Sequence, residues 1–202
     1  MSTLLFTVHC SLFTGFKKMR FKEQYNKEVI PAMMARFGYK SKMAVPRIEK
    51  VSVNTGFGRS IVALGNDEQR KIVQNFVDDL SLICGQKSAP TRAKKSIASF
   101  KLRQGLVIGV KTTLRGAKME DFVDRLVRIV LPRTRDFKGL DAKSISQQGD
   151  LSIGIKEQIA FPEVSPENIK RIFGLEVVIH TTARNKEEGL ELLKLLGFPF
   201  KA

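Results

Sequence analysis

The sequence is short of the residues that most often carry catalysis, metal binding and covalent cross-links. Its 202 residues include two cysteines, two histidines and no tryptophan. Two isolated thiols exclude a disulfide scaffold, and with two distant histidines they cannot build a four-ligand zinc site. The sequence also lacks any uncharged apolar run of about 18 or more residues, so it predicts no membrane-spanning helix. A reducing cytoplasm is the simplest compartment for such a chain.

The histidines and the isolated carboxylates form no catalytic pattern. His9 and His180 have no base, nucleophile or metal ligand close to them in the sequence, and Glu157 and Glu163 stand alone. Cys84 follows an apolar helical stripe and is predicted to be a small core residue. We therefore predict that the chain is not an enzyme and needs no metal, cofactor or small-molecule substrate.

Acidic residues are missing from one long stretch. The forty positions from Leu80 to Met119 contain no Asp or Glu. The same positions contain nine basic residues: Lys87, Arg92, Lys94, Lys95, Lys101, Arg103, Lys111, Arg115 and Lys118. Because like charges repel, a chain that concentrates them is expected to have a polyanionic partner. With a formal charge of +15, the chain suits RNA, DNA or an anionic membrane surface.

Hydrophobic periodicity predicts helices and strands in alternation. Helical spacing covers 21–37, about 66–83, 118–131 and 185–196, and Ser165-Pro166-Glu167 is typical of a further helix start. Alternation typical of half-buried strands covers 47–57, 106–114, 151–161 and 175–183. This order allows a parallel α/β sheet or an α+β fold. The alternating strands favour a sheet with helices on one face and the other face open.

Particular residues predict where the helices begin and end. Pro31 should kink or restart the first helix, and Pro132 should stop the third. Two glycines are expected as C-caps: Gly38 and Gly85. Three side chains are candidates for helix N-caps: Asn66, Asp67 and Asn185.

Two segments between these elements are polar and basic. Residues 91–101 are aperiodic and rich in small residues, so we predict a long loop whose backbone can approach a phosphate chain. Its candidate contacts are Thr91, Arg92, Lys94, Lys95 and Ser96. For residues 133–148, two interpretations remain open, namely contact with nucleic acid and capping of the preceding helix by basic side chains.

The turn Asn54-Thr55-Gly56-Phe57-Gly58 contains Gly-x-Gly at the end of a predicted strand. It lacks the third glycine of a dinucleotide site and the Gly-Lys-Ser/Thr of a P-loop. The glycines are therefore interpreted as turn residues. Asn54 differs, because a polar amide at the end of a strand could bind RNA.

Residues 1–18 differ from the rest of the chain. Residues 1–16 are apolar and uncharged, and basic residues follow them rather than precede them. We interpret 1–18 as a non-structural N-terminal extension, with a weak export signal as the alternative. Residues 19–202 have a length that suits a single domain.

Six short motifs occur in one order along the chain. They are VPRIEK at Val45–Lys50, GQK at Gly85–Lys87, AKKSIA at Ala93–Ala98, TLRG at Thr113–Gly116, LPRTRDF at Leu131–Phe137 and FPE at Phe161–Glu163. Together, and over about residues 20–201, they resemble the bacterial-type large-subunit ribosomal protein five family. Proteins of that family bind 5S ribosomal RNA.

The resemblance implies an α+β fold with a mainly antiparallel sheet, helices packed on one face and the other face open for RNA. It implies a structural role in the central protuberance of the large subunit of a bacterial-type, cytoplasmic ribosome. The implied contacts with 5S ribosomal RNA are Lys50, Asn54, Gln86 and Thr113. The basic loop at 91–100, with Arg92, Lys94 and Lys95 at its tip, is implied to contact the peptidyl-site tRNA.

Further implied partners are large-subunit ribosomal RNA and small-subunit protein thirteen, a contact to which the motifs assign no residues. The chain departs from the family in three places. Residues 1–18 have no counterpart, and the proline that follows Gly-Gln-Lys is displaced to Pro90. Where many members have Gly-Arg-Gly-Asn-Tyr, this chain has Gln147-Gln148-Gly149-Asp150-Leu151, so the contact of that arginine or tyrosine with RNA is not expected here.

Three other functions fit the basic charge taken by itself. An architectural DNA- or RNA-binding protein outside the ribosome would use the same charge, although the sequence has no recognition helix with a basic face. An enzyme acting on RNA or phosphorylated metabolites needs a poised base, nucleophile or metal site. A binder of anionic membranes needs a helix with a wholly basic polar face. The ribosomal interpretation accounts for the motifs as well as the charge.

Overall fold

The computed structural model describes residues 21–61, 65–164 and 171–201. In these residues, five strands form one sheet in the order β2-β3-β1-β5-β4, and every neighbouring pair is antiparallel. The strands are β1 (Ile48–Gly56), β2 (Ala89–Arg92), β3 (Val107–Leu114), β4 (Leu151–Ile155) and β5 (Leu175–Thr181). With the helices packed against it, this sheet confirms the predicted α+β fold.

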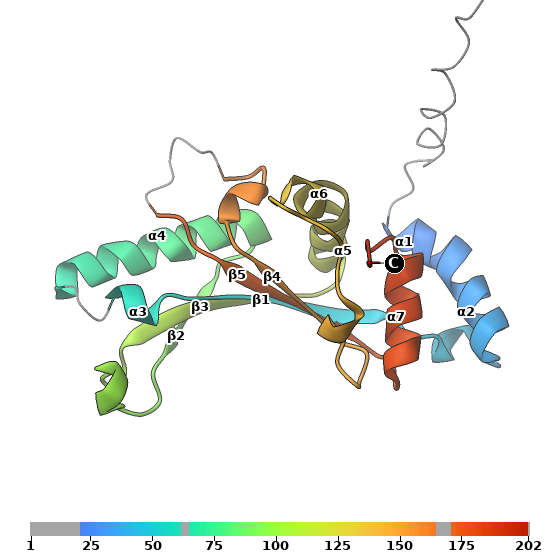
Figure 1. The fold of residues 1–202 in the computed structure, drawn as a ribbon, viewed down its shortest axis with the longest axis horizontal. Coiled ribbons are helices and arrows are strands. Elements are labelled where there is room, and N and C mark those ends of the chain that lie inside the picture. The colour runs from blue at the N-terminus through green and yellow to red at the C-terminus, as the bar shows by residue number, and fades with distance from the viewer. Residues whose placement is uncertain (1–20, 62–64, 165–170, 202) are drawn as a thin grey trace, which may run out of the picture.

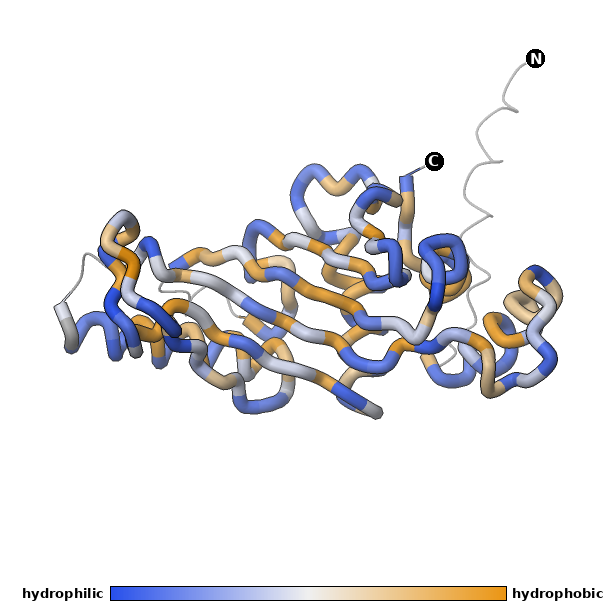
Figure 2. Tube along the Cα trace, turned by 90° about the horizontal axis from the view of Figure 1, so that it is seen from below, coloured by the Kyte–Doolittle hydropathy of each residue, from blue (hydrophilic) through white to orange (hydrophobic). Residues whose placement is uncertain are grey.

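The helices lie along one face of the sheet and at one of its ends (Figure 1). Along the face lie α4 (Asn66–Cys84), α5 (Ala117–Arg125) and α6 (Leu131–Arg133). At the end lie α1 (Phe21–Gln24), α2 (Ile30–Phe37) and α7 (Lys186–Leu195), while α3 (Gly58–Ile61) follows β1. The view from below shows no α-helix of the described residues over the opposite face, which is termed the open face (Figure 2).

The strands bury one face because their apolar side chains alternate. In β1, Val51 and Val53 are fully buried, and their register partners on β5 are the fully buried Ile179 and Val177. The helices contribute Leu80, Ile83, Phe122 and Leu126 to the same core. Burying such a side chain contributes about 1.5–3 kcal/mol, so this one-sided burial decides which way each strand faces.

Two prolines lie inside helical segments rather than at their ends. Each is the second residue of an α-helix that continues from a π-helical turn. Pro31 of α2 follows the π turn Tyr25–Val29. Pro132 of α6 follows the π turn Leu126–Val130. A proline ring clashes with the carbonyl four residues earlier in an α-helix. The wider π turn, whose bonds span five residues, relieves that clash. The helix ends at Arg133, two residues later than predicted, so Pro132 marks its end only approximately.

The ends of two predicted segments also differ from the sequence pattern. The predicted loop at 91–101 begins inside β2, because Thr91 and Arg92 pair with β3. No alternation indicates this strand, since all four of its residues are exposed. Pro90 fits there because β2 is an edge strand, which can lack a backbone donor.

At the other edge of the sheet, β4 ends at Ile155 rather than at residue 161 as predicted, because the chain turns into a 3₁₀ segment at Gln158–Ala160.

The predicted C-caps are confirmed, whereas the N-cap of α4 is not. Gly38 and Gly85 end their helices in the left-handed conformation, with φ of 68° and 61°. The N-cap of α4 is Gly65, so the prediction of Asn66 or Asp67 is wrong. The helix start predicted at residues 165–167 lies outside the described residues.

The last helix begins where predicted but is held by a different bond. Asn185 occupies the N-cap position of α7 without a side-chain capping bond. Instead, the backbone N–H of Arg184 donates to Glu188 Oε2 at 3.0 Å. The carboxylate in the first turn therefore satisfies a backbone donor at the helix start.

Helix α7 crosses very close to the turn before β4. Gly149 lies in that turn with a φ of +84°. A Cβ added to Gly189 of α7 would lie 2.5 Å from the Cα of Gly149 and 2.6 Å from its carbonyl oxygen. The two backbones therefore touch, and only glycine at position 189 leaves room for this contact.

Gly189→Ala tests that contact. In an unpacked helix this change stabilises by about 1 kcal/mol. Here we expect it to lower the free energy of unfolding by about 1–3 kcal/mol, because the new methyl group overlaps the backbone of Gly149. Denaturant unfolding of the full chain measures the change, and Lys186→Ala at an exposed position of the same helix is the control. A stabilised Gly189→Ala variant would contradict the close packing.

Candidate nucleic-acid interface

Three of the predicted RNA contacts, Lys50, Asn54 and Thr113, lie on the open face. In β1, Lys50 and Asn54 alternate with fully buried valines, so their side chains point away from the helices. The register pairs Asn54 with Lys111 of β3, and it pairs Ser52, the next residue on this face, with Thr113. Because paired residues point to the same face, all three predicted contacts share it.

The fourth predicted contact, Gln86, lies beside Thr113. Its Nε2 donates a hydrogen bond to the carbonyl oxygen of Thr113 at 3.4 Å. Gln86 is exposed and directly follows Gly85, the C-cap of α4, whereas Lys50, Asn54 and Thr113 are half-buried. The fold therefore places Gln86, from the segment after α4, next to Thr113 of β3.

Small side chains separate these polar groups on the open face. By register and alternation they are Ser52, Gly56, Gly109, Ser152 and Gly154. A Cβ added to Gly56 or Gly154 would meet no heavy atom within 4 Å, so nothing stands over the backbone there. The backbone of a bulky ligand can therefore come close at Gly56 and Gly154, while the exposed Glu176 of β5, the register partner of Asn54, lies on the same face.

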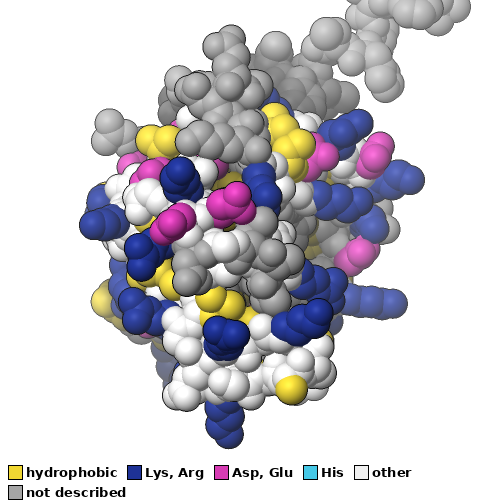
Figure 3. Space-filling view, turned by 90° about the vertical axis from the view of Figure 1, so that its left-hand side faces the viewer, with side chains coloured by type: hydrophobic (Ala, Val, Ile, Leu, Met, Phe, Trp, Pro, Cys, Tyr) yellow, Lys and Arg dark blue, Asp and Glu magenta, His cyan; other side chains and the backbone are white. Residues whose placement is uncertain are grey.

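The positive charge of the acid-free stretch is not neutralised by ion pairs in the described part of the chain. None of its nine basic residues is a partner in an ion pair there. Lys118 has a structural bond, because its Nζ donates to the carbonyl oxygen of Gly85 at 3.0 Å, at the helix end where a cation is favourable. In the view onto the end that carries the β2–β3 hairpin, Lys and Arg surround the lower part and no acidic side chain is visible on it (Figure 3).

The residues predicted to contact tRNA follow the hairpin that joins β2 to β3. Thr91 and Arg92 belong to β2 at its base. The outgoing arm carries Lys94, Lys95 and Ser96, and all five side chains are exposed. The far end is the turn Ala98–Phe100, between the bridged residues Ile97 and Leu102. The prediction that Arg92, Lys94 and Lys95 form the tip is therefore wrong, because the hairpin extends beyond them.

Beside Lys50, the fold assembles a serine, a histidine and an aspartate that are far apart in the sequence. Ser52 Oγ lies 3.3 Å from His180 Nε2, and His180 Nδ1 lies 3.0 Å from Asp150 Oδ2. Asp150 Oδ1 also accepts from the backbone N–H of Thr181 at 2.8 Å. Ser52 is only 7% exposed, so its hydroxyl is not an accessible nucleophile. The network orders the open face, and both ring nitrogens of His180 have a polar partner.

The described residues offer no site for a metal ion and no membrane span. No group of three or more His, Cys, Asp and Glu side chains among them could hold a metal. None of the helices in the same residues is both long enough and apolar enough to cross a bilayer.

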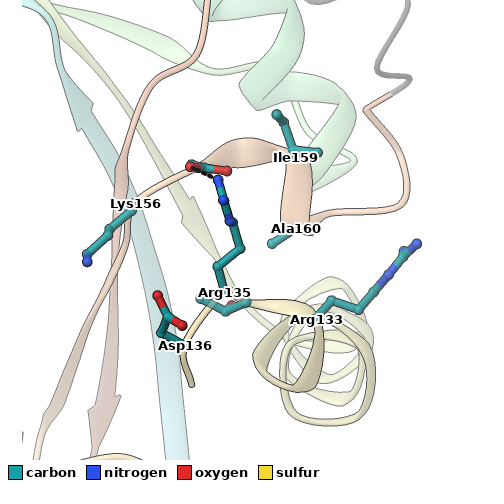
Figure 4. Close-up of a pocket in the computed structure, with 8 residues that line it drawn as sticks. Arg133, Arg135, Asp136, Lys156, Ile159 and Ala160 are labelled. Atoms are coloured by element: carbon teal, nitrogen blue, oxygen red, sulfur yellow. Dashed lines mark ion pairs between the residues drawn. The ribbon is translucent and has the colours of Figure 1, made fainter. Parts of the chain in front are cut away.

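The second basic segment, residues 133–148, borders a cavity of about 440 Å³. Arg135 forms an ion pair with Glu157, marked by the dashed line at Arg135 in Figure 4, while Arg133 points away from it. The two atoms of the pair, Arg135 Nη1 and Glu157 Oε1, lie 3.5 Å apart. The preceding helix is closed by Thr134, whose Oγ1 donates to the carbonyl oxygen of Val130 at 2.9 Å. A threonine rather than a basic side chain therefore closes the helix, and contact of this segment with nucleic acid stays a prediction.

Two residues noted in the sequence have structural roles behind the open face. Glu163 forms an ion pair with Arg125, whose Nη2 also donates to the carbonyl oxygen of Ile83 at 3.4 Å. No sequence pattern indicates this pair, because its partners lie in separate segments. Cys84 is 2% exposed, and burial raises the pKa of its thiol to about 12. The thiol stays protonated and packs as a core residue, as predicted.

Comparison with known proteins identifies a family. Residues 41–103 match the family described as ribosomal protein L5, and residues 107–200 match the ribosomal L5P family C-terminus. The large ribosomal subunit protein uL5 of Thermoanaerobacter sp. (strain X514) is 50% identical over 181 residues, which are 90% of this chain and 98% of that protein. Proteins of the same name from Clostridium botulinum (strain Eklund 17B / Type B) and Carboxydothermus hydrogenoformans are 48% and 49% identical over the same shares.

These matches confirm the resemblance, the non-enzymatic role and the predicted location in the cytoplasmic ribosome. The division into an extension at 1–18 and a single domain at 19–202 stays a prediction, because residues 1–20 lie outside the described ranges. The two matched regions include every residue assigned above to the open face and the hairpin. The chain therefore belongs to the ribosomal protein L5 family, and it is a structural constituent of the large ribosomal subunit and binds ribosomal RNA.

Proposed function

We propose that the open face binds 5S ribosomal RNA and helps to attach it in the central protuberance of the large subunit. The observation that carries this proposal is the common placement of Lys50, Asn54 and Thr113 on that face, with Gln86 beside them. The family resemblance implies the same four residues as contacts with 5S ribosomal RNA. The register thus brings three of the residues that the motifs imply onto one surface, which supports the proposal.

The side chains of the open face suit a folded RNA. Lysines bind phosphates without regard to base sequence, so Lys50 helps to position the protein on the RNA but does not distinguish between base sequences. The amide of Asn54 and the hydroxyl of Thr113 can each donate and accept, which suits 2′-hydroxyls and irregular base edges. The small residues between them, such as Gly154, leave room for the RNA backbone.

Asn54→Ala should weaken binding of 5S ribosomal RNA by about 2- to 10-fold, the size expected for one lost hydrogen bond. The unfolding temperature should not change, because Asn54 is half-buried on the open face rather than packed in the core. Filter binding with 5S ribosomal RNA at fixed salt measures the affinity. Asn26→Ala removes an exposed amide from the turn Tyr25–Val29 and is the matched control. Equal affinity of Asn54→Ala and the unchanged chain would contradict the proposed 5S site.

We further propose that the β2–β3 hairpin contacts the peptidyl-site tRNA. The hairpin projects from the sheet on the side away from α4 (Figure 1). Lys94 and Lys95 are exposed on it and form no ion pair with any described residue. Two separate basic surfaces would allow 5S RNA and tRNA to bind at once. Contacts with other large-subunit RNA and with small-subunit protein thirteen are proposed from the resemblance and have no residues assigned.

Lys94→Ala combined with Lys95→Ala should spare binding of 5S ribosomal RNA and weaken tRNA in the peptidyl site. Loss of two phosphate contacts should reduce the slope of log affinity against log salt by roughly 1.5. Binding of tRNA to ribosomes that carry the variant chain, at several salt concentrations, measures this slope. Lys22→Ala with Lys27→Ala removes the same charge from exposed positions near the N-terminal end and is the control. Loss of 5S binding in the Lys94/Lys95 variant would contradict the assignment of separate surfaces.

A further inference from the structure

The end of the β2–β3 hairpin is an ordered turn. At its neck, the backbone N–H of Ala93 donates to the carbonyl of Leu106 at 2.8 Å. Further out, Ile97 and Leu102 exchange two backbone hydrogen bonds of 3.0 and 3.1 Å. Ser96 Oγ accepts from the backbone N–H of Gln104 at 2.9 Å and links the two arms. Because both arms are bonded along their length, the backbone at the tip is held in a defined position.

Phe100 stands at this tip with its ring in solvent. Its side chain is 65% exposed, and Lys101 next to it reverses the chain with a φ of 51°. Other phenylalanines are buried in the core: Phe57, Phe76, Phe122, Phe161, Phe173 and Phe198. Burial of such a ring is strongly favourable, so an ordered turn that holds Phe100 out of the core leaves a contact surface for a partner.

The charge around Phe100 indicates what kind of partner fits. The hairpin carries Lys94, Lys95, Lys101 and Arg103, which are all exposed, and no acidic residue occurs between Leu80 and Met119. An aromatic ring among cations is a poor contact for a neutral apolar surface, which would have to desolvate those charges. It suits a polyanion that also offers flat π-faces. Nucleic acid with an unpaired base has both properties, since phosphates bind the cations and bases stack on aromatic rings.

We propose that Phe100 is a stacking platform for an unpaired or end-exposed base of a folded RNA. Lys101, the next residue, and Lys95, five residues before the ring, bind the phosphates next to that base. This inference rests on the proposed contact between the hairpin and tRNA, and it adds that an aromatic face as well as charge recognises the ligand.

The test uses ribosomes that carry the variant chain and a tRNA probe in the peptidyl site. The probe contains 2-aminopurine at one unpaired loop position at a time, because stacking on an aromatic ring quenches this fluorescent base. Phe100→Ala and Phe100→Leu should each weaken tRNA binding about 5- to 100-fold, the range expected for one lost base–aromatic stack. Quenching at one loop position should disappear with them. Phe100→Tyr, which keeps the ring, should retain both signals, and Leu82→Ala at a 60% exposed position should change neither.

The outcomes separate this inference from the proposed function beneath it. If Phe100→Ala binds normally while the Lys94/Lys95 variant is weakened, the stacking platform is wrong and the electrostatic contact stands. If neither variant is weakened, the proposed tRNA contact fails and the platform fails with it. If Phe100→Leu retains full affinity, the contact is apolar packing without stacking, and this also overturns the platform.

Discussion

Burial of one face of the sheet is the constraint on which the other features depend. Side chains alternate along a strand, so packing Val51 and Val53 against the helices forces Lys50, Ser52 and Asn54 to the opposite side. A slip of the register by one residue would exchange the two sets. The core therefore fixes the positions of polar side chains that have little packing of their own, and the helices need not approach the open face.

The same alternation puts the apolar residues that stabilise the fold and the lysines that repel one another on opposite faces of the sheet. The acid-free stretch includes β3, where the exposed Lys111 lies in the register between Asn54 and Ala89. On the other side of β3, Val110 and Leu114 are buried and hold the strand in place. Repulsion among the cations opposes folding of the free chain. A polyanion that binds these side chains reduces that repulsion, so binding of ribosomal RNA and stability of the fold are coupled.

The sequence predicted those features that rest on local periodicity or on single residues with strong backbone preferences. Alternation indicated β1 and β3, and Gly38 indicated a left-handed helix end. Features that depend on contacts between residues far apart in the sequence were not predicted. The all-exposed β2 shows no alternation, and the contact of Asp150 with His180 exists only because β4 and β5 pair in one register. The helix runs two residues past the predicted end at Leu131, because a π turn, which has no sequence signal of its own, accommodates Pro132.

Pro90 in β2 has a consequence for the chain before it reaches its assembly. β2 is one outer edge of the sheet, and an exposed edge can recruit a strand from another molecule and start aggregation. A proline offers no N–H to an incoming strand, and Arg92 adds a charge to the same edge. Newly made copies that outnumber their ribosomes would therefore resist edge-to-edge stacking, which protects a protein that must wait in solution for its RNA.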